Sequence, residues 1–404
     1  MRGSRDKRLA FSAVLVAVVA VVLIVPETAS AIPAFARKYR MSCTTCHAPA
    51  PRLKEYGEEF AGNAFRLPDK EEPKRYFYDT GDDLLMLQRE VPLAVRFDAY
   101  VSYEYREIDD RTIDNYDFKT PWAAKLMSGG NLAPWIGYYF YFYLSERGEV
   151  AGIEDAYVHF NNLFGMDLDL MVGQFQASDP LFKRELRLTY EDYECYKFTV
   201  GETPTNLAYD RGFMVTYGSS IGLDAAIEVV NGSGLGEADA SRLYDFDDYK
   251  NVLVRLSQSI GPVRLGGFGY FGKGFEWTFS RWVENLHRYW GIDGTIDIGD
   301  RVQINGQFLE RYDENPFYYV VSPVDVTTRG GLLEVVWAVH GEMGRPFVTF
   351  LYNNIDSEYS PLDYRSETLN VSYLLRRNLR LMAETTFMEE NEKWRFVSGF
   401  TAAF

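Results

Sequence analysis

Apolar and polar residues alternate along most of the chain from about residue 94 onward. In 134–146 one parity is apolar throughout: Ile136, Tyr138, Phe140, Phe142 and Leu144. In 300–311 the parities separate, with Val302, Ile304, Gly306 and Phe308 alternating with Arg301, Gln303, Asn305 and Gln307. A soluble sandwich also alternates, but here the segments repeat at about ten residues, the length of a membrane-crossing strand. The pattern predicts an all-β fold, a transmembrane antiparallel β-barrel with polar residues facing the lumen.

Short and long links alternate between these segments. The short links contain Leu163–Gly165, Ser219–Gly222, Ser259–Pro262 and Arg376–Asn378. The long links are 177–209, 231–249, 272–286 and 312–329. Outer-membrane barrels have short periplasmic turns and long extracellular loops. We therefore expect about 16 strands between Ala94 and Phe404, with both ends of the barrel in the periplasm.

The first 31 residues have the three parts of a secretory signal peptide. Arg2, Arg5, Lys7 and Arg8 precede an apolar stretch over 9–25, and Ala29-Ser30-Ala31 forms a small-residue cleavage site. An uncleaved anchor is the alternative, because the apolar stretch could nearly span a bilayer. The small-residue end favours cleavage and a mature chain that begins at Ile32.

Composition narrows the class of protein further. The formal charge of −16 argues against nucleic acid, whose binding rests on basic patches. No second long apolar run follows the signal, which excludes a helical membrane protein. Aromatic residues make up 16% of the chain, as in barrels with aromatic girdles. Three cysteines in 404 residues exclude a disulfide scaffold.

Cys43-Thr44-Thr45-Cys46-His47 is a C-x-x-C-H run, the attachment site of a c-type haem. Cys43 and Cys46 would hold one haem c covalently, and His47 would be the proximal iron ligand. A zinc site would need a further Cys or His nearby. The third cysteine, Cys195, is distant in sequence and is expected to be an incidental thiol.

The residues between the signal and the first strand predict a small haem segment with a linker, over 32–93. Leu53, Tyr56, Gly57 and Phe60 recur at helical spacing, so one helix face can cover the haem. A core of about sixty residues is marginal without other support. We therefore expect this α-helical segment to plug the lumen of the barrel formed by 94–404.

This N-terminal region resembles a known family. The matching residues are Pro33–Arg37, Met41–His47, Pro51, Leu53, Gly57 and Phe60. They resemble the start of the outer-membrane monohaem cytochrome–porin fusions of the iron-oxidase type. The resemblance implies electron passage across the outer membrane, from iron or another external partner to a periplasmic cytochrome. Glu154–Val158 and Val172–Phe175 also resemble strands of phosphate-selective-type porins.

The sequence leaves the sixth haem ligand open. By parity, His159 and, as a weaker candidate, His340 point into the lumen near the periplasmic end, whereas His287 falls at an extracellular strand end. The sulfur donors Met86, Met127, Met166 and Met343 are further candidates, as is an open position. Met41 is too close to Cys43 to reach the opposite haem face.

Three classes of function follow. The first is electron transfer between an external donor or acceptor, with iron(II) as one option, and a periplasmic cytochrome; such a protein could act as an iron(II):cytochrome c oxidoreductase. The second is a diffusion porin for anionic solutes with a haem-bearing plug, using lumen arginines: Arg96, Arg255, Arg264, Arg301, Arg380 and Arg395. The third is a peroxidase-like haem enzyme.

Two acidic clusters fall in loops expected outside the cell. They are Asp245, Asp247 and Asp248, and Glu191, Asp192 and Glu194. Carboxylates suit hard divalent cations and could gather iron(II). Charged residues are equally expected on any outer-membrane surface.

Overall fold

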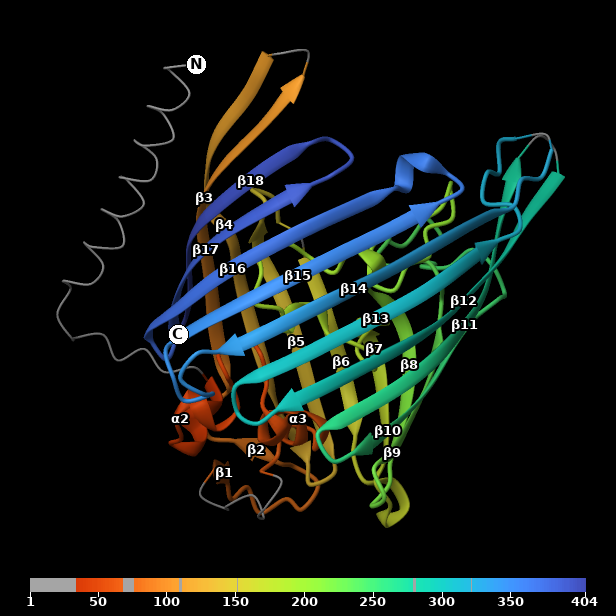
Figure 1. The fold of residues 1–404 in the computed structure, drawn as a ribbon. Coiled ribbons are helices and arrows are strands. Elements are labelled where there is room, and N and C mark those ends of the chain that lie inside the picture. Colours follow the sequence, from red (N-terminus) through yellow and green to blue (C-terminus); the bar gives the residue numbers. More distant parts are fainter. Residues whose placement is uncertain (1–33, 68–75, 109–110, 151, 279–280, 321) are drawn as a thin grey trace, which may run out of the picture.

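The computed structural model describes residues 34–67, 76–108, 111–150, 152–278, 281–320 and 322–404. Over these residues, sixteen strands close into one barrel (Figure 1). The strands are β3 Leu93–Ile108, β4 Arg111–Ala133, β5 Ile136–Glu146, β6 Gly152–Phe160, β7 Leu168–Phe175, β8 Asp210–Gly218, β9 Leu223–Val230, β10 Asn251–Ile260, β11 Val263–Thr278, β12 Arg281–Ile298, β13 Val302–Asp313, β14 Val326–Ala338, β15 Pro346–Ser357, β16 Tyr364–Arg376, β17 Leu379–Met388 and β18 Lys393–Ala403. The predicted signal peptide, residues 1–31, lies outside the described residues.

Every strand pairs antiparallel with its neighbours in sequence, and the last strand returns to the first. β18 pairs with β3 over eleven residues, from Lys393 opposite Arg106 to Ala403 opposite Arg96. Closure of this kind leaves no unpaired strand edge, a requirement in a medium without water. The predicted barrel and its strand number are therefore confirmed.

Side chains alternate between the two faces of the wall, as the sequence predicted. On β13, Asn305 and Gln307 are buried in the interior, whereas Phe308 points outward and is exposed. On β12 the outward residues include Trp290 and Ile292, both at least half exposed. The outer face is thus apolar, and much of the inner face carries amides, hydroxyls and charges.

The strands are joined by short turns at one end, the short-turn end, and mainly by longer loops at the other, the long-loop end. Both ends of the barrel sequence, Leu93 and Phe404, lie at the short-turn end, where Phe404 bonds Val95 through two backbone hydrogen bonds. The prediction of a long loop at 272–286 is wrong. There β11 continues to Thr278 and pairs with β12, which begins at Arg281, so this segment extends the barrel wall as a hairpin.

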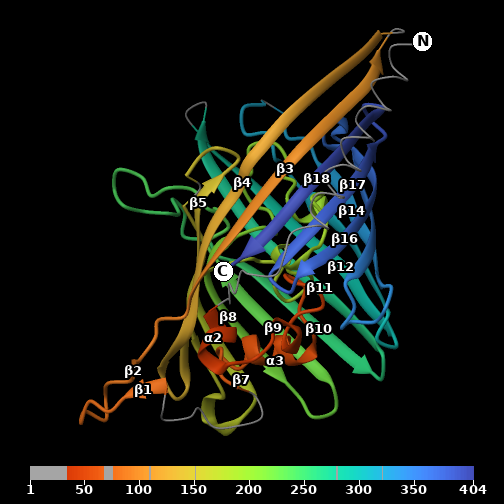
Figure 2. The same cartoon turned by 90° about the vertical axis from the view of Figure 1, so that its left-hand side faces the viewer.

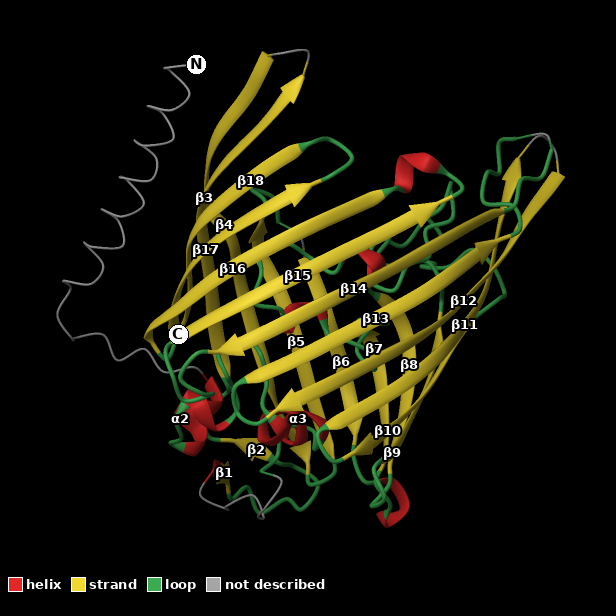
Figure 3. Ribbon diagram, viewed as in Figure 1, coloured by secondary structure: helices red, strands yellow, loops and turns green. Residues whose placement is uncertain are grey.

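The prediction of a surface loop at 177–209 is wrong as well. Residues 176–209, here called the inner loop, fold into the barrel and contain the helical turns η4 Arg184–Leu186 and η5 Glu194–Tyr196 (Figure 3). Its side chains form an apolar core with the inner wall; the loop members include Leu181, Phe182, Tyr193, Tyr196 and Phe198. Exposing this many apolar side chains to water would be unfavourable, so the loop buries them against the inner faces of the strands.

The N-terminal segment 34–67, here called the plug, lies within the short-turn end (Figures 1 and 2). It consists of α2 Ala34–Tyr39, η1 Cys43–Thr45 and α3 Glu55–Gly62, and is followed by a small hairpin, β1 Phe77–Tyr78 and β2 Leu87–Gln88. Two further turns, η3 Leu163–Gly165 and η6 Ser360–Leu362, lie in links of the barrel. Among the described helices, none has the length and apolar character to cross a bilayer.

Polar contacts fix the plug to the wall. Asn63 accepts a hydrogen bond from Asn161 at 2.5 Å, and Asn131 donates to the Ala64 carbonyl at 3.2 Å. Lys54 pairs with Glu342 at 3.1 Å in the β14–β15 turn. These contacts spread over several strands, so the plug has one defined position in the barrel mouth.

Candidate functional site

The segment from Cys43 to His47 is a compact turn. Its first residues form η1, capped by Ser42, whose hydroxyl accepts the Thr44 backbone N–H at 3.3 Å. The His47 N–H donates to the Cys43 carbonyl at 2.9 Å. The turn therefore brings the two thiols and the imidazole of a five-residue stretch to the same cavity.

Helix α3 packs directly on this turn at Gly57. A Cβ at Gly57 would lie 2.3 Å from the Cys46 carbonyl oxygen, closer than any side chain allows. The same carbonyl accepts the Lys54 N–H at 2.8 Å, just before the helix begins. Glycine at this position thus lets the helix cover the cysteine turn at backbone contact.

The hydrogen bonds of His47 determine which ring nitrogen is available. Nδ1 lies 3.1 Å from the Pro51 carbonyl oxygen and 3.3 Å from that of Arg52. A carbonyl only accepts, so Nδ1 carries the proton and Nε2 of the neutral ring keeps its lone pair. Burial lowers the pKa of His47, which favours the neutral ring. This is the arrangement of a histidine prepared to bind a metal through Nε2.

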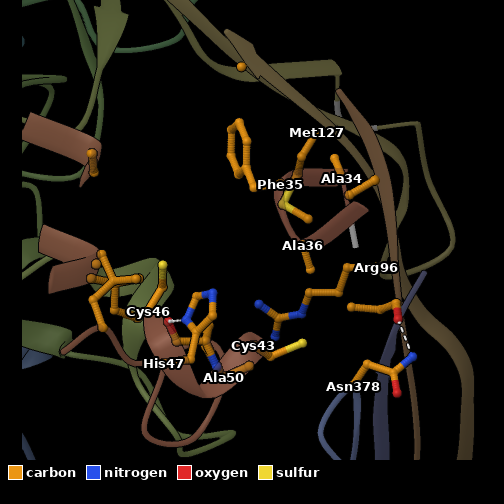
Figure 4. Close-up of a pocket in the computed structure, with 18 of the residues that line it drawn as sticks. Ala34, Phe35, Ala36, Cys43, Cys46, His47, Ala50, Arg96, Met127 and Asn378 are labelled. Carbon is orange, nitrogen blue, oxygen red and sulfur yellow. Dashed lines mark hydrogen bonds between the residues drawn. The ribbon is translucent and has the colours of Figure 1, made fainter. Parts of the chain in front are cut away.

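Both cysteines and His47 line one cavity of about 300 Å³. Figure 4 shows them on one side of an open space, with Phe35 and Met127 on the other. The walls are mainly apolar and include Met41, Phe60 and Phe65. Burial raises the pKa of both thiols, because an apolar wall disfavours thiolates. The donor set and the apolar walls fit a haem attached through Cys43 and Cys46.

Three separate parts of the chain build this cavity: the plug, the wall and the inner loop. The wall contributes Arg96, Tyr141 and Arg380, and the inner loop contributes Lys183 and Glu185. Sequence reasoning did not place the inner-loop residues here, because the link was read as a surface loop. The number of large apolar residues in 177–209 was the signal that could have indicated a buried loop.

Glu185 links the inner loop to the cavity wall. Its carboxylate pairs with Lys125 at 3.1 Å and accepts the Tyr141 hydroxyl at 3.2 Å. Burial opposes ionisation, but Lys125, Arg187 and Arg96 outweigh it and hold the pKa of Glu185 down, to about 2. The carboxylate is therefore charged at neutral pH and anchors the loop beside the cavity.

The structure does not bring either predicted distal histidine to the cysteine cavity. His159 points into the lumen as expected, but it lines a second cavity and pairs with Asp169 at 3.3 Å. His340 lies exposed in the β14–β15 turn. His287 is buried on β12 beside Asn251.

Of the predicted sulfur donors, Met127 lines the cysteine cavity, whereas Met86, Met166 and Met343 do not. Met41 lines it from the plug, near the cysteines in sequence, as expected. Met127 is therefore the candidate distal group that the structure brings together with His47.

The acidic clusters have different environments. Glu191, Asp192 and Glu194 do not lie on the surface: the first two are buried in the inner loop. Asp192 pairs with Arg184 and Arg187, and Glu191 pairs with Arg395. Asp245 lies in the link between β9 and β10 and pairs with Lys250 at 2.5 Å. Within the described residues, no group of three or more His, Cys, Asp or Glu side chains could share a metal ion.

The expected row of lumen arginines is largely paired. Arg255 bonds Asp293 at 2.5 Å, and Arg96 bonds Asp98 at 3.1 Å. Arg301 is not in the lumen, since it lies exposed in the turn before β13. Cys195 is fully buried in the inner-loop core, where burial raises its pKa.

The barrel defines the class of fold: it is that of the outer-membrane porins. The anion-selective porin from Comamonas acidovorans is 12% identical, with a TM-score of 0.56, over 78% of this chain and 99% of that one. OmpF of Salmonella typhi in complex with daunomycin is 10% identical, with a TM-score of 0.54, over 80% and 98%. The channel DcaP of Acinetobacter baumannii is 12% identical, with a TM-score of 0.52, over 78% and 97%. No family model and no curated protein matches the chain.

Proposed function

We propose that the chain is a c-type cytochrome of the outer membrane, built on a porin-like barrel, that passes electrons between an external partner and a periplasmic cytochrome. The observation that carries this proposal is the geometry of the cysteine turn. His47 has its Nδ1 proton fixed by backbone carbonyls, and it shares an apolar cavity with Cys43 and Cys46. A Cys-x-x-Cys-His run that occurred by coincidence would have no reason to place both thiols and a histidine with a free Nε2 in one apolar cavity.

Each residue has a specific role in this function. Cys43 and Cys46 would hold the haem covalently, His47 would bind its iron through Nε2, and Met127 would supply the sixth ligand. The haem, when bound, supplies one-electron redox chemistry. Arg96, Arg377 and Arg380 also line the cavity and offer cationic partners for carboxylates. The apolar plug residues Phe35, Phe60 and Phe65 exclude water from the site.

The first experiment tests attachment and electron exchange together. The chain is produced in a host with c-type maturation, and covalent haem is detected on a denaturing gel. We expect haem in the original chain and in Cys195→Ala, and none in a Cys43→Ala/Cys46→Ala variant. Rapid reduction of the oxidised protein by ferrous iron would place iron on the donor side. Reduction by a periplasmic cytochrome, with reoxidation by external acceptors, would indicate export; failure of both would overturn the proposal.

The ligand assignment makes a separate prediction. Met127→Leu keeps the volume of the side chain but removes the thioether, and a methionine ligand raises haem potential. We expect a lower midpoint potential and loss of the methionine–iron spectral signature, with haem content unchanged. Met41→Leu is the matched control, since Met41 lines the same cavity from the cysteine side. An unchanged spectrum in Met127→Leu would contradict the assignment.

A second candidate is a diffusion porin for small anions, with the plug as an accessory. The likeness of the barrel to porins, among them the anion-selective porin of Comamonas acidovorans, favours it. The inner loop narrows the lumen. The ion pairs of Arg255 with Asp293 and of Arg395 with Glu191 offset the cationic charge of the lumen. Both features favour electron transfer over anion diffusion. Single-channel conductance separates the two functions, since a diffusion porin passes a large anion-selective current and a sealed barrel does not.

A further inference from the structure

A second cavity lies in the lumen beside α3. It measures about 380 Å³ and is lined by residues of the plug, the inner loop and two arcs of the wall, β6 to β8 and β11 to β14. His159 of β6, Met171 of β7 and Met214 of β8 all line it. None of these three residues has a role in the haem site described above.

The strand register places the three residues in one row. His159 is directly opposite Met171, and Met171 is directly opposite Met214. Opposite side chains on neighbouring strands have Cβ atoms about 4.5–5.5 Å apart. All three point inward, since their neighbours Val172 and Phe213 point outward and are exposed. One nitrogen and two thioether sulfur atoms can therefore reach a common point above Met171.

His159 has the hydrogen bonding expected of a metal ligand. Its Nε2 lies 3.3 Å from the Asp169 carboxylate, so Nε2 donates and the neutral ring keeps a lone pair on Nδ1. Nδ1 is buried and has no hydrogen-bond partner among the described residues. A buried polar atom without a partner is costly, and a carboxylate on the other ring nitrogen is the usual outer partner of a metal-binding histidine.

We propose that His159, Met171 and Met214 bind a soft monovalent metal ion of the copper(I) class. Thioether sulfur is a soft ligand that selects copper(I) over the hard cations that oxygen ligands prefer. The charge of the site suits a cation. Lys183 also lines the cavity but is paired with Asp179 at 3.0 Å, and Asp169 stands beside the histidine.

Two other cationic side chains line this cavity, Arg52 and Arg264. Arg52 donates to the Gln303 side chain of β13 at 3.1 Å and to the Ala48 carbonyl at 2.6 Å, so its guanidinium already has two oxygen partners. Met171 and Met214 also fill apolar space against the inner-loop core. Leucine would fill that space equally well, so substitution by leucine separates metal binding from packing.

The test is a competition titration of the full haem-loaded chain, in detergent, with copper(I) held by a coloured chelator. With the cysteines occupied, we expect one tightly bound equivalent. A Met171→Leu/Met214→Leu variant should lose affinity at least tenfold. Met382→Leu is the matched control, since Met382 is likewise buried and inward-facing, but on β17. X-ray absorption of the loaded protein should show sulfur and nitrogen scatterers.

Equal copper affinity in the double variant and the original chain would overturn the proposal. So would a loss of affinity caused by Met127→Leu alone, because it would locate copper in the cysteine cavity. The haem spectrum, recorded on the same samples, reports on the proposed cytochrome function separately. Silver(I), which does not change redox state, repeats the titration without electron exchange with the haem.

Discussion

At the scale of single residues, the closest backbone contact at the candidate site occurs at Gly57. Adding a methyl group there would press it against the Cys46 carbonyl at 2.3 Å. We expect Gly57→Ala to separate α3 from the cysteine turn and to destabilise the plug by about 1–3 kcal/mol. Thermal melting followed by haem absorbance measures the effect.

The control for this change lies in the same helix. Gly62 ends α3, and a Cβ there would meet nothing within 4 Å. Gly62→Ala should be neutral or stabilise the helix by roughly 0.5–1 kcal/mol. Equal melting of the two variants would show that the contact at Gly57 does not hold the turn.

The cysteine turn was accessible from sequence because its residues lie within five positions of one another. Parity also predicted correctly that His159 faces the lumen. Which inward residues share a cavity, however, depends on register and on the depth reached by the plug. Met127 therefore came into the site and His159 did not, although parity favoured His159 and Met127 was only one of four sulfur donors. Side chains from strands that are far apart in sequence come together only when the barrel closes.

At the scale of elements, one buried carboxylate of the wall holds the middle of the inner loop by its backbone. Glu384 of β17 accepts the backbone N–H groups of Tyr190 at 2.6 Å and Glu191 at 2.9 Å, and the Asn370 amide at 3.0 Å. Glu384→Ala leaves these donors unpaired in a buried place. We expect a cost of about 3–5 kcal/mol and release of the loop from the wall.

Limited proteolysis of the intact barrel measures this release. Trypsin should cleave the Glu384→Ala variant at Arg184 or Arg187, which are held by Asp192 in the original loop. Glu389→Ala is the control, because its pair with Arg365 is exposed and contributes about 0–1 kcal/mol. Cleavage at the same rate in both variants would mean that Glu384 does not anchor the loop.

The strands were predictable as elements because alternation and turn spacing are local signals. The inner loop was not, since its sequence shows length and charge without a repeating pattern. Its charges are paired inside the barrel, Asp192 with Arg184 of the loop and Glu191 with Arg395 of β18. Its apolar residues complete the core of the barrel. Whether a long link folds into the lumen or stays outside depends on the space that the closed barrel leaves in its interior, which the sequence of the link alone does not show.

At the scale of the whole molecule, two obstructions lie along the lumen: the plug at the short-turn end and the inner loop. Resistances in series add, so opening one obstruction leaves the current limited by the other. We expect low single-channel conductance from the original chain in a planar bilayer. Glu384→Ala alone should change the conductance little. The plug variant Lys54→Ala/Asn63→Ala, which removes the contacts of Lys54 with Glu342 and of Asn63 with Asn161, should also change it little.

Combining both sets of substitutions should raise the conductance by much more than the sum of the separate effects. Heat-dependent gel mobility, which distinguishes closed barrels from unfolded chains, confirms that each variant still folds. A large anion-selective current through the original chain would contradict this expectation and favour the diffusion porin. If the chain conducts poorly until both obstructions are opened, the lumen excludes solutes around the cavity of Cys43, Cys46 and His47. That result would agree with the proposed electron-transfer function and not with a diffusion porin.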